Sequence, residues 1–317
     1  SYSQNQGIIM PGFNKKPQFF GQDWQFMAPG IPFALGSQNV DIRELSSQGG
    51  WLTNNTQLNQ FFKLTNNETV NLRGTLEPVK GFRVELTANR TKTNNTQEIF
   101  RFDDELNDYN SFNVVENGSH SISFISWNTA FISDATNHSN QTFQDFRNNR
   151  SIIANRLANE NPYDNPVVDS TGFPLGYQST SQEVLIPAFI AAYAGKNPAT
   201  VKLSKFPNIP LPNWRITYDG LRNIRWIKKY LNTISLSHSY KSTYSVGSYV
   251  TSLDYQEGFE QWPSLINDAT LNYFDKYEIN QVSLRESLNP LIKVDMTFKK
   301  IMLLNYLLRK TIKNLCK

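Results

Sequence analysis

The stretch that decides the fold is residues 206–250, FPNIPLPNWRITYDGLRNIRWIKKYLNTISLSHSYKSTYSVGSYV. Its second half alternates with a period of two, which is the repeat of a β-strand. One parity is mainly apolar: Ile234, Leu236, His238, Tyr240, Tyr244, Val246 and Val250, interrupted by Ser242 and Ser248. The other parity is small and polar: Ser235, Ser237, Ser239, Lys241, Thr243 and Ser245.

This polar parity has little that builds a protein core, so two environments fit the strand. Either the polar face meets water while the apolar face packs on a core, or the polar face lines a wet lumen while the apolar face meets lipid, as in a transmembrane β-barrel. Residues 231–250 are about twice as many as a spanning strand needs. The strand is therefore expected to project beyond the membrane or to bend, for instance at Gly247. Nearby aromatic residues fit interfacial belts: Trp214, Tyr218, Trp226, Tyr230, Tyr244 and Tyr249.

Other segments repeat this alternation. Residues 69–77 and 82–91 predict a hairpin around the turn 78–81, and residues 291–299 alternate sharply. Residues 277–286 predict a further strand, and 119–132 a less regular one. Residues 92–118 are polar and acidic and predict a long surface loop. The strands predict an all-β protein.

Between residues 140 and 208 the strand alternation gives way to apolar residues at helical spacing, which predicts a helical insertion. One helix is expected over 141–159, with Thr142 as a candidate N-cap, and another over 182–195, ending at Gly195. The sequence does not say on which side of a barrel this insertion lies, at its mouth or inside its lumen. The predicted organisation is barrel strands and long loops over 1–139, the insertion over 140–208, barrel strands over 209–299, and an aberrant tail over 300–317.

Composition narrows the class of protein. The chain has 317 residues, a net charge of +4 and one cysteine, Cys316, which excludes an internal disulfide framework. Its basic residues are spread along the chain, so we expect no nucleic-acid partner. The cluster Arg222, Arg225, Lys228 and Lys229 instead fits a barrel rim that touches lipid headgroups. The chain does not begin with Met, and we expect it to be a fragment of a longer protein.

No catalytic constellation stands out. His120, His138 and His238 lie outside any familiar zinc-binding spacing, and His238 fits a structural role on the apolar parity. The acidic run Asp103–Glu105 lacks the spacing of a calcium loop and reads as a solvated loop. The sequence therefore predicts no catalytic residue, no cofactor and no metal ligand. An enzyme has no support here, although distant segments can still converge into a site.

Several long runs carry a family resemblance. They are LPNWRITYDGL (211–221), LSHSY (236–240), STYSVGSY (242–249), VLIPAF (184–189) and SLNPLIKVDMTF (287–298). Together they resemble the C-terminal part of the SprA/Sov family, the outer-membrane translocon of the type IX secretion system and of gliding motility in Bacteroidota. The resemblance is strongest over residues 182–298 and looser before residue 140.

This resemblance implies one arc of a very large antiparallel transmembrane β-barrel in the cell outer membrane. The implied function is passage of folded client proteins with C-terminal signals, gliding adhesins among them, to the cell surface. The implied partners are those clients, a PorV-type shuttle barrel, a plug protein and outer-membrane lipid. The family would continue with another alternating strand over 300–317, so we expect a frameshift or a truncated end there; a genuine amphipathic tail is the alternative. The alternative is a soluble or surface β-sandwich that binds a ligand without catalysis.

Overall fold

The computed structural model describes residues 1–26, 28–39, 41–132, 140–162, 168, 170–256, 258 and 262–299. Nine of the described strands form one antiparallel sheet, and the others form two ribbons of two strands each. The fold is thus mostly β, as predicted. The predictions for residues 300–317, for His138 and for Cys316 lie outside the described residues.

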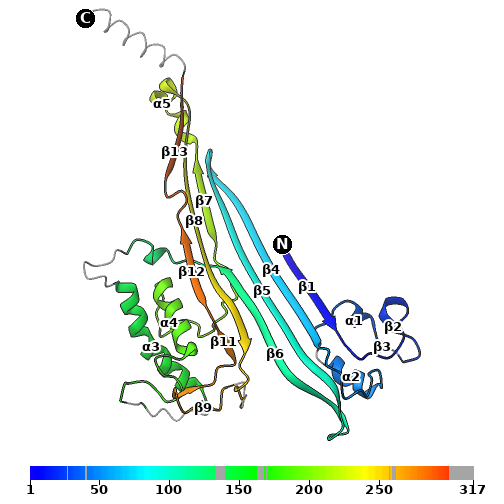
Figure 1. Ribbon diagram of the computed structural model, residues 1–317. Helices are drawn as coiled ribbons and strands as arrows, with labels where there is room; N and C mark the ends of the chain where they lie inside the picture. The colour runs from blue at the N-terminus through cyan, green and yellow to red at the C-terminus, as the bar shows by residue number, and fades with distance from the viewer. Residues whose placement is uncertain are drawn as a thin grey trace, which may run out of the picture.

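Four long strands form the body of the sheet (Figure 1): β4 (Phe62–Val79), β5 (Phe82–Asp103), β6 (Asp108–Ser123) and β8 (Leu231–Thr251). At about 3.3 Å per residue, a strand with the 21 residues of β8 is about 70 Å long. The long strand predicted over 231–250 is therefore confirmed. The long surface loop predicted over 92–118 is wrong, because β5 and β6 pair through most of that range. Their Thr, Asn and Gln side chains are polar but compatible with a strand that has a solvated face.

Shorter strands complete two columns of the sheet. β7 (Asn213–Tyr218) continues the line of β6, since both pair with β5 on one side and β8 on the other. β11 (Tyr277–Ile279), β12 (Val282–Ser287) and β13 (Lys293–Phe298) follow one another along the far side of β8. β1 (Tyr2–Ile9) pairs with β4 at the opposite edge. The sheet is thus six columns wide.

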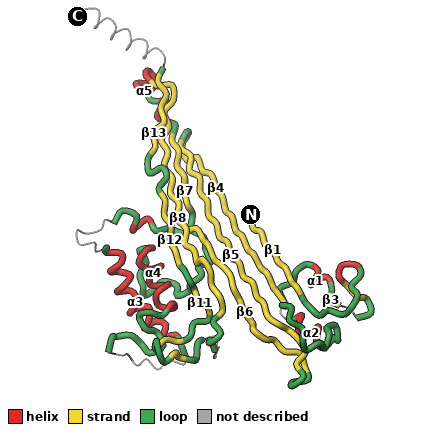
Figure 2. The backbone as a smooth tube through the Cα atoms, in the orientation of Figure 1, coloured by secondary structure: helices red, strands yellow, loops and turns green. Residues whose placement is uncertain are grey.

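The chain leaves the sheet after Ser123 and returns at Asn213, and a helical insertion fills the interval (Figure 2). Its elements are η2 (Trp127–Thr129), α3 (Gln141–Glu160) and α4 (Gln182–Ala194). The ribbon of β9 (Ile266–Asn267) with β10 (Asn272–Tyr273), from later in the chain, packs against the same core. The two predicted helices are confirmed, and Gly195 ends α4 in the left-handed conformation. The N-cap of α3 is Asn140, whose side chain accepts a hydrogen bond from the Thr142 backbone, so Thr142 is not the cap.

The N-terminal segment forms a second cover over the lower end of β1, β4 and β5, as drawn in Figure 1. Its elements are η1 (Phe19–Gly21), β2 (Gln22–Asp23), β3 (Ala28–Pro29), α1 (Ile31–Ala34) and α2 (Ile42–Gln48). Leu52 packs there against Phe62, Leu64 and Phe100 of the sheet. Two short elements lie between β7 and β8 at the upper end: η3 (Gly220–Asn223) and α5 (Arg225–Tyr230).

Residues paired across antiparallel strands share a face of the sheet, so the register assigns side chains to two faces. We call the face that carries Val84, Ile216 and His238 the apolar face, and the opposite one the polar face. Between a first register shift next to Leu231, which pairs with Phe298, and a second one between Val246 and Tyr249, the two parities of β8 keep these faces. This bulge, at the predicted bend near Gly247, puts Tyr249 on the apolar face. Val250 therefore lies on the polar face, contrary to the simple alternation.

Candidate functional surface

The polar face of the sheet carries mainly small hydrophilic side chains. One row crosses all six columns, and each of its members carries a hydroxyl group: Ser3, Thr69, Thr91, Ser121, Ser245 and Ser283. The Ser121 and Ser245 oxygens lie 3.2 Å apart. Charged side chains such as Arg73 and Glu85 sit nearer the upper end, 3.8 Å apart. Apolar side chains such as Ile99 and Phe112 join this face toward the lower end of the sheet. Water solvates such a surface readily, and it offers no core.

The upper half of the apolar face is an uncovered apolar band. On β8 the band runs from Leu231 to Tyr240, about the length of a tilted strand that crosses a bilayer. Leu72 and Leu76 of β4 are each more than half exposed, and Met296 of β13 nearly so. The band also includes the following residues of the five columns concerned: Phe82, Val84, Leu86, Ala88, Trp214, Ile216, Tyr218, Ile234, Leu236, His238 and Val294.

Aromatic rings mark the lower border of this band. The Trp214 and Tyr240 rings stack with their centroids 4.3 Å apart, and Trp127 of the insertion contacts both from 5.7 and 5.4 Å. Trp226 and Tyr230 are exposed at the opposite end, on α5. Of the residues predicted to form interfacial belts, Trp214 thus lies at one end of the band, and Trp226 and Tyr230 lie at the other. Tyr244 and Tyr249 do not form such a belt, because the insertion buries them.

The insertion covers the lower half of the same face around β6, β8 and β12. Tyr244 is completely buried there, with Val184 and Ile153 of the two helices in the same core. The Tyr244 hydroxyl donates a hydrogen bond to the Lys205 carbonyl oxygen at 2.9 Å. The apolar parity of β8 is therefore buried from Tyr240 to Val246, at the level of the insertion, and partly exposed from Ile234 to His238.

A buried polar network joins the first turn of the insertion to the sheet. The Tyr240 hydroxyl donates to a Glu286 carboxylate oxygen at 2.6 Å, and the Ser126 hydroxyl donates to the same oxygen at 2.8 Å. The Ser126 backbone N–H donates to the Tyr240 oxygen at 2.9 Å. Because these buried groups satisfy one another, they fix the position at which the chain leaves the sheet.

A charged cluster holds the other side of the insertion. The Lys205 ammonium lies 2.5 Å from a Glu183 oxygen and 3.9 Å from an Asp275 oxygen. Desolvation lowers the pKa of Lys205, but the two carboxylates outweigh it and the pKa is raised. Burial and the nearby Glu183 raise the pKa of Asp275 to about 7, although Lys205 opposes the shift. The Lys205 ammonium therefore stays charged at neutral pH, and its contact with Glu183 anchors the start of α4.

His120 is buried on the apolar face between the sheet and the insertion. Its ring meets Phe206 edge to face, with centroids 5.8 Å apart. Burial lowers the pKa of His120 to about 4, and the cations Lys92 and Arg90 act in the same direction. The ring is therefore neutral at pH 7 and packs as part of the core. His238, at the edge of the apolar band, places Nδ1 2.6 Å from the Leu291 carbonyl oxygen, in the structural role predicted for it.

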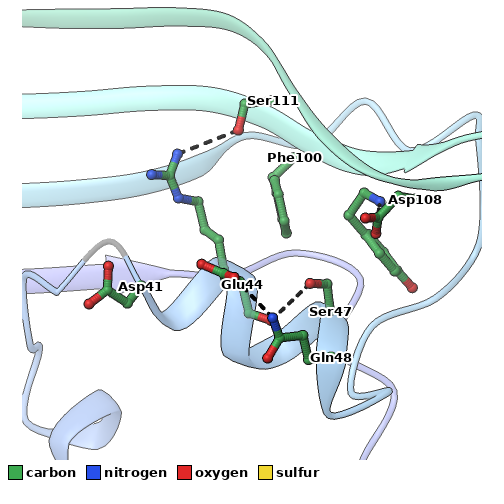
Figure 3. A pocket seen from close by; sticks show the side chains of 9 residues that line it. Asp41, Glu44, Ser47, Gln48, Phe100, Asp108 and Ser111 are labelled. Carbon is green, nitrogen blue, oxygen red and sulfur yellow. Dashed lines mark hydrogen bonds between the residues drawn. The ribbon is translucent and has the colours of Figure 1, made fainter. Parts of the chain in front are cut away.

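A groove of about 450 Å³ lies between α2 and the sheet (Figure 3). The Arg43 guanidinium donates to the buried Glu98 carboxylate and, at 3.4 Å, to the Ser111 hydroxyl. Phe100 and Tyr109 form an apolar wall, with ring centroids 5.8 Å apart. The groove contains carboxylates and hydroxyls but neither histidine nor cysteine among its lining residues. We assign it to the anchoring of the N-terminal cover.

The remaining sequence candidates lie apart from one another. Asp103 ends β5, and Glu105 follows in the short turn before β6. The cluster Arg222, Arg225, Lys228 and Lys229 lies on η3 and α5 at the upper end. Within the described ranges, no group of three His, Cys, Asp or Glu residues is placed to hold a metal ion. No described helix is long and apolar enough to cross a membrane.

Two comparisons with known proteins found no match. No protein-family model matches the chain, and no curated protein sequence matches it. The candidate surface therefore rests on the geometry of the sheet and on the sequence patterns. Sequence reasoning missed the Lys205 cluster and the Tyr240–Glu286 network, because both join residues distant in the chain through the cover that the insertion forms.

Proposed function

We propose that this chain forms an arc of the wall of a very large outer-membrane β-barrel, as part of a protein-conducting translocon of the SprA/Sov type. The carrying observation is that the hydroxyl row and the apolar band lie on opposite faces of one sheet. In this role the polar face lines a wet lumen, and the band meets lipid. The function is passage of folded client proteins, not catalysis.

The open edges of the sheet support a wall that further strands complete. β1 at one edge and β11, β12 and β13 at the other pair on one side only among the described strands. Unpaired backbone groups are costly in lipid. The chain alone is therefore expected to give no uniform closed channel in a planar bilayer. A stable, single-conductance pore from the isolated chain would contradict the proposal.

The resemblance of residues 182–298 to the family supplies the rest of the proposal. The clients would carry C-terminal signals and include gliding adhesins, and a PorV-type barrel and a plug protein would be partners. On this reading, the insertion lies on the outer wall and not in the lumen, since it packs on the apolar face. A β-sandwich, the alternative, would need a second large sheet, and the described strands include only one.

Cysteine reactivity in the membranes of producing cells tests the two faces of the wall. Leu236 and Ser237 are neighbours on β8 that point to opposite faces, so Leu236→Cys and Ser237→Cys form a matched pair in a Cys316→Ser background. We expect a water-soluble maleimide to label position 237 and a lipid-soluble one to label position 236. Equal labelling of both positions by the water-soluble reagent would reject the wall and favour a soluble module.

A further inference from the structure

The two ends of the insertion along α3 and α4 differ in the side chains they carry. The end nearer the apolar band carries a group of aromatic side chains, which we call the aromatic end: Trp127, Phe131, Phe143, Phe146, Phe189 and Tyr193. Phe131 is 60% exposed and Phe143 is 49% exposed. Exposed rings gathered at one end of a domain form an apolar patch of the kind that marks an interaction site.

The aromatic end is built from three segments that meet. Residues 127–132 cross the top of the insertion in Figure 1. The first turns of α3 supply Phe143 and Phe146, and the last turns of α4 supply Phe189 and Tyr193. The ring centroid of Phe146 lies 6.0 Å from that of Phe143 and 6.5 Å from that of Phe189, and the Phe189 and Tyr193 centroids are 4.6 Å apart. The Thr129 hydroxyl donates to the Tyr193 carbonyl oxygen at 3.1 Å, which ties the crossing segment to α4.

The same rings continue into the border of the apolar band. Trp127 contacts Phe131 on one side, at 5.5 Å, and Trp214 and Tyr240 of the sheet on the other. The aromatic end therefore begins at the level where the band ends. Charged side chains accompany it: Arg147 and Asp145 are exposed on the first turns of α3, and Lys196 is exposed just after the end of α4. Rings at the border of an apolar surface, with cations beside them, match the headgroup zone of a bilayer.

We propose that the aromatic end of the insertion is a lipid-docking surface that rests on the headgroup region and sets how deep the wall sits in the membrane. The inference rests on the proposed function, because the band must meet lipid for the aromatic end to lie at its boundary. The partner is a lipid surface, recognised by ring insertion and by cation contact with phosphate. The lower end of the insertion, about 24 Å farther along α3 at Asn159, then lies in water.

Depth-dependent quenching tests this docking surface. Single cysteines at Phe131→Cys and Phe143→Cys, in a Cys316→Ser background, carry a fluorescent label in outer-membrane vesicles from producing cells. Both native side chains are exposed, so the labels should not disturb the core. The matched control is Asn159→Cys on the same helix, and Leu236→Cys reports on the band. Lipids with a nitroxide in the headgroup or at the middle of the acyl chain serve as quenchers.

We expect the headgroup nitroxide to quench positions 131 and 143 and to leave position 159 bright, while the mid-chain nitroxide quenches position 236. Quenching at 236 with none at 131 and 143 would overturn the docking surface and leave the wall intact. Loss of quenching at 236 alone would overturn the wall and leave the insertion as a peripheral membrane surface. Equal quenching at 143 and 159 would overturn the proposed orientation of the insertion.

Discussion

The two halves of the apolar face have the same alternation but different surroundings. In the lower half, Tyr244 and Val246 are buried under helices; in the upper half, Leu236 is partly exposed and Met296 of the neighbouring β13 is 49% exposed. Leu236, Tyr244 and Val246 lie on the same strand, β8, and its parity does not change between them. The difference teaches that a period of two identifies a strand with an apolar face but does not identify what covers that face.

In the sequence, the insertion that covers the lower half shows only as a change from strand alternation to helical spacing. Residues 124–212 form a single excursion from one column, and they return to the sheet beside the point where they left it, since the Leu211 N–H donates to the Ser123 carbonyl oxygen at 3.0 Å. The insertion therefore covers this part of the sheet and is attached to it where the chain leaves and returns. We expect changes beneath it to cost more than changes in the band, and the following experiments rank those costs.

The largest expected effect comes from a buried ring beneath the insertion. Tyr244→Ala removes a fully buried side chain and its hydrogen bond to Lys205, which should lower the free energy of unfolding by about 4 kcal/mol. Leu236→Ala, on the same strand and face, should lower the free energy of unfolding in detergent by less than about 1 kcal/mol, because detergent chains fill the space that the removed side chain leaves. Urea unfolding in detergent measures both. Equal losses would mean that the band also packs on a fixed core.

A second large effect is expected from the charged cluster. Lys205→Met removes the cation that faces Glu183 and Asp275 and leaves two carboxylates close together, at a cost of about 3 kcal/mol. The loss should appear as faster proteolysis of the insertion. The surface variant Lys202→Met, three residues away, is the control and should leave the rate unchanged. A Lys205→Met protein that resists protease as wild type does would show that the cluster does not hold the cover.

The sequence predicted the strands better than their partners. Alternation located β4, β5 and β8, and Gly195 located the end of α4. The prediction of a loop over 92–118 is wrong, because a strand with a solvated face tolerates the polar residues there. The sequence could not predict the Lys205 cluster or the burial of Tyr244 and Tyr249, because these depend on packing between segments far apart in the chain.

A smaller effect of pH should separate two buried groups that titrate in opposite directions. The folded-state pKa of Asp275, raised to about 7, gives stability that is full near pH 4 and is lost as the pH rises to 7. The folded-state pKa of His120, lowered to about 4, gives stability that is full above pH 6.5 and is lost as the pH falls toward 4. The two contributions oppose each other in the wild-type protein.

Single variants should expose each slope between pH 4 and 7. Relative to wild type, Asp275→Asn should gain stability as the pH rises, because the Asp275 contribution is gone. His120→Phe should show the reverse, a relative gain as the pH falls. Thermal unfolding at a series of pH values measures both. Parallel pH profiles for the three proteins would contradict the burial assigned to these groups beneath the insertion.

The smallest effect is expected on the polar face, where neither lipid nor a core meets the side chains. The Arg73–Glu85 pair spans 3.8 Å and the Arg73 side chain is 72% exposed, so Arg73→Gln should change stability by about 0.5 kcal/mol or less. Ser245→Ala should have a similarly small effect, because water can replace the lost hydroxyl as the hydrogen-bond partner of Ser121. A large loss at either position would mean that another part of the protein covers this face, which would remove the wet lumen that the opposed faces of the sheet favour.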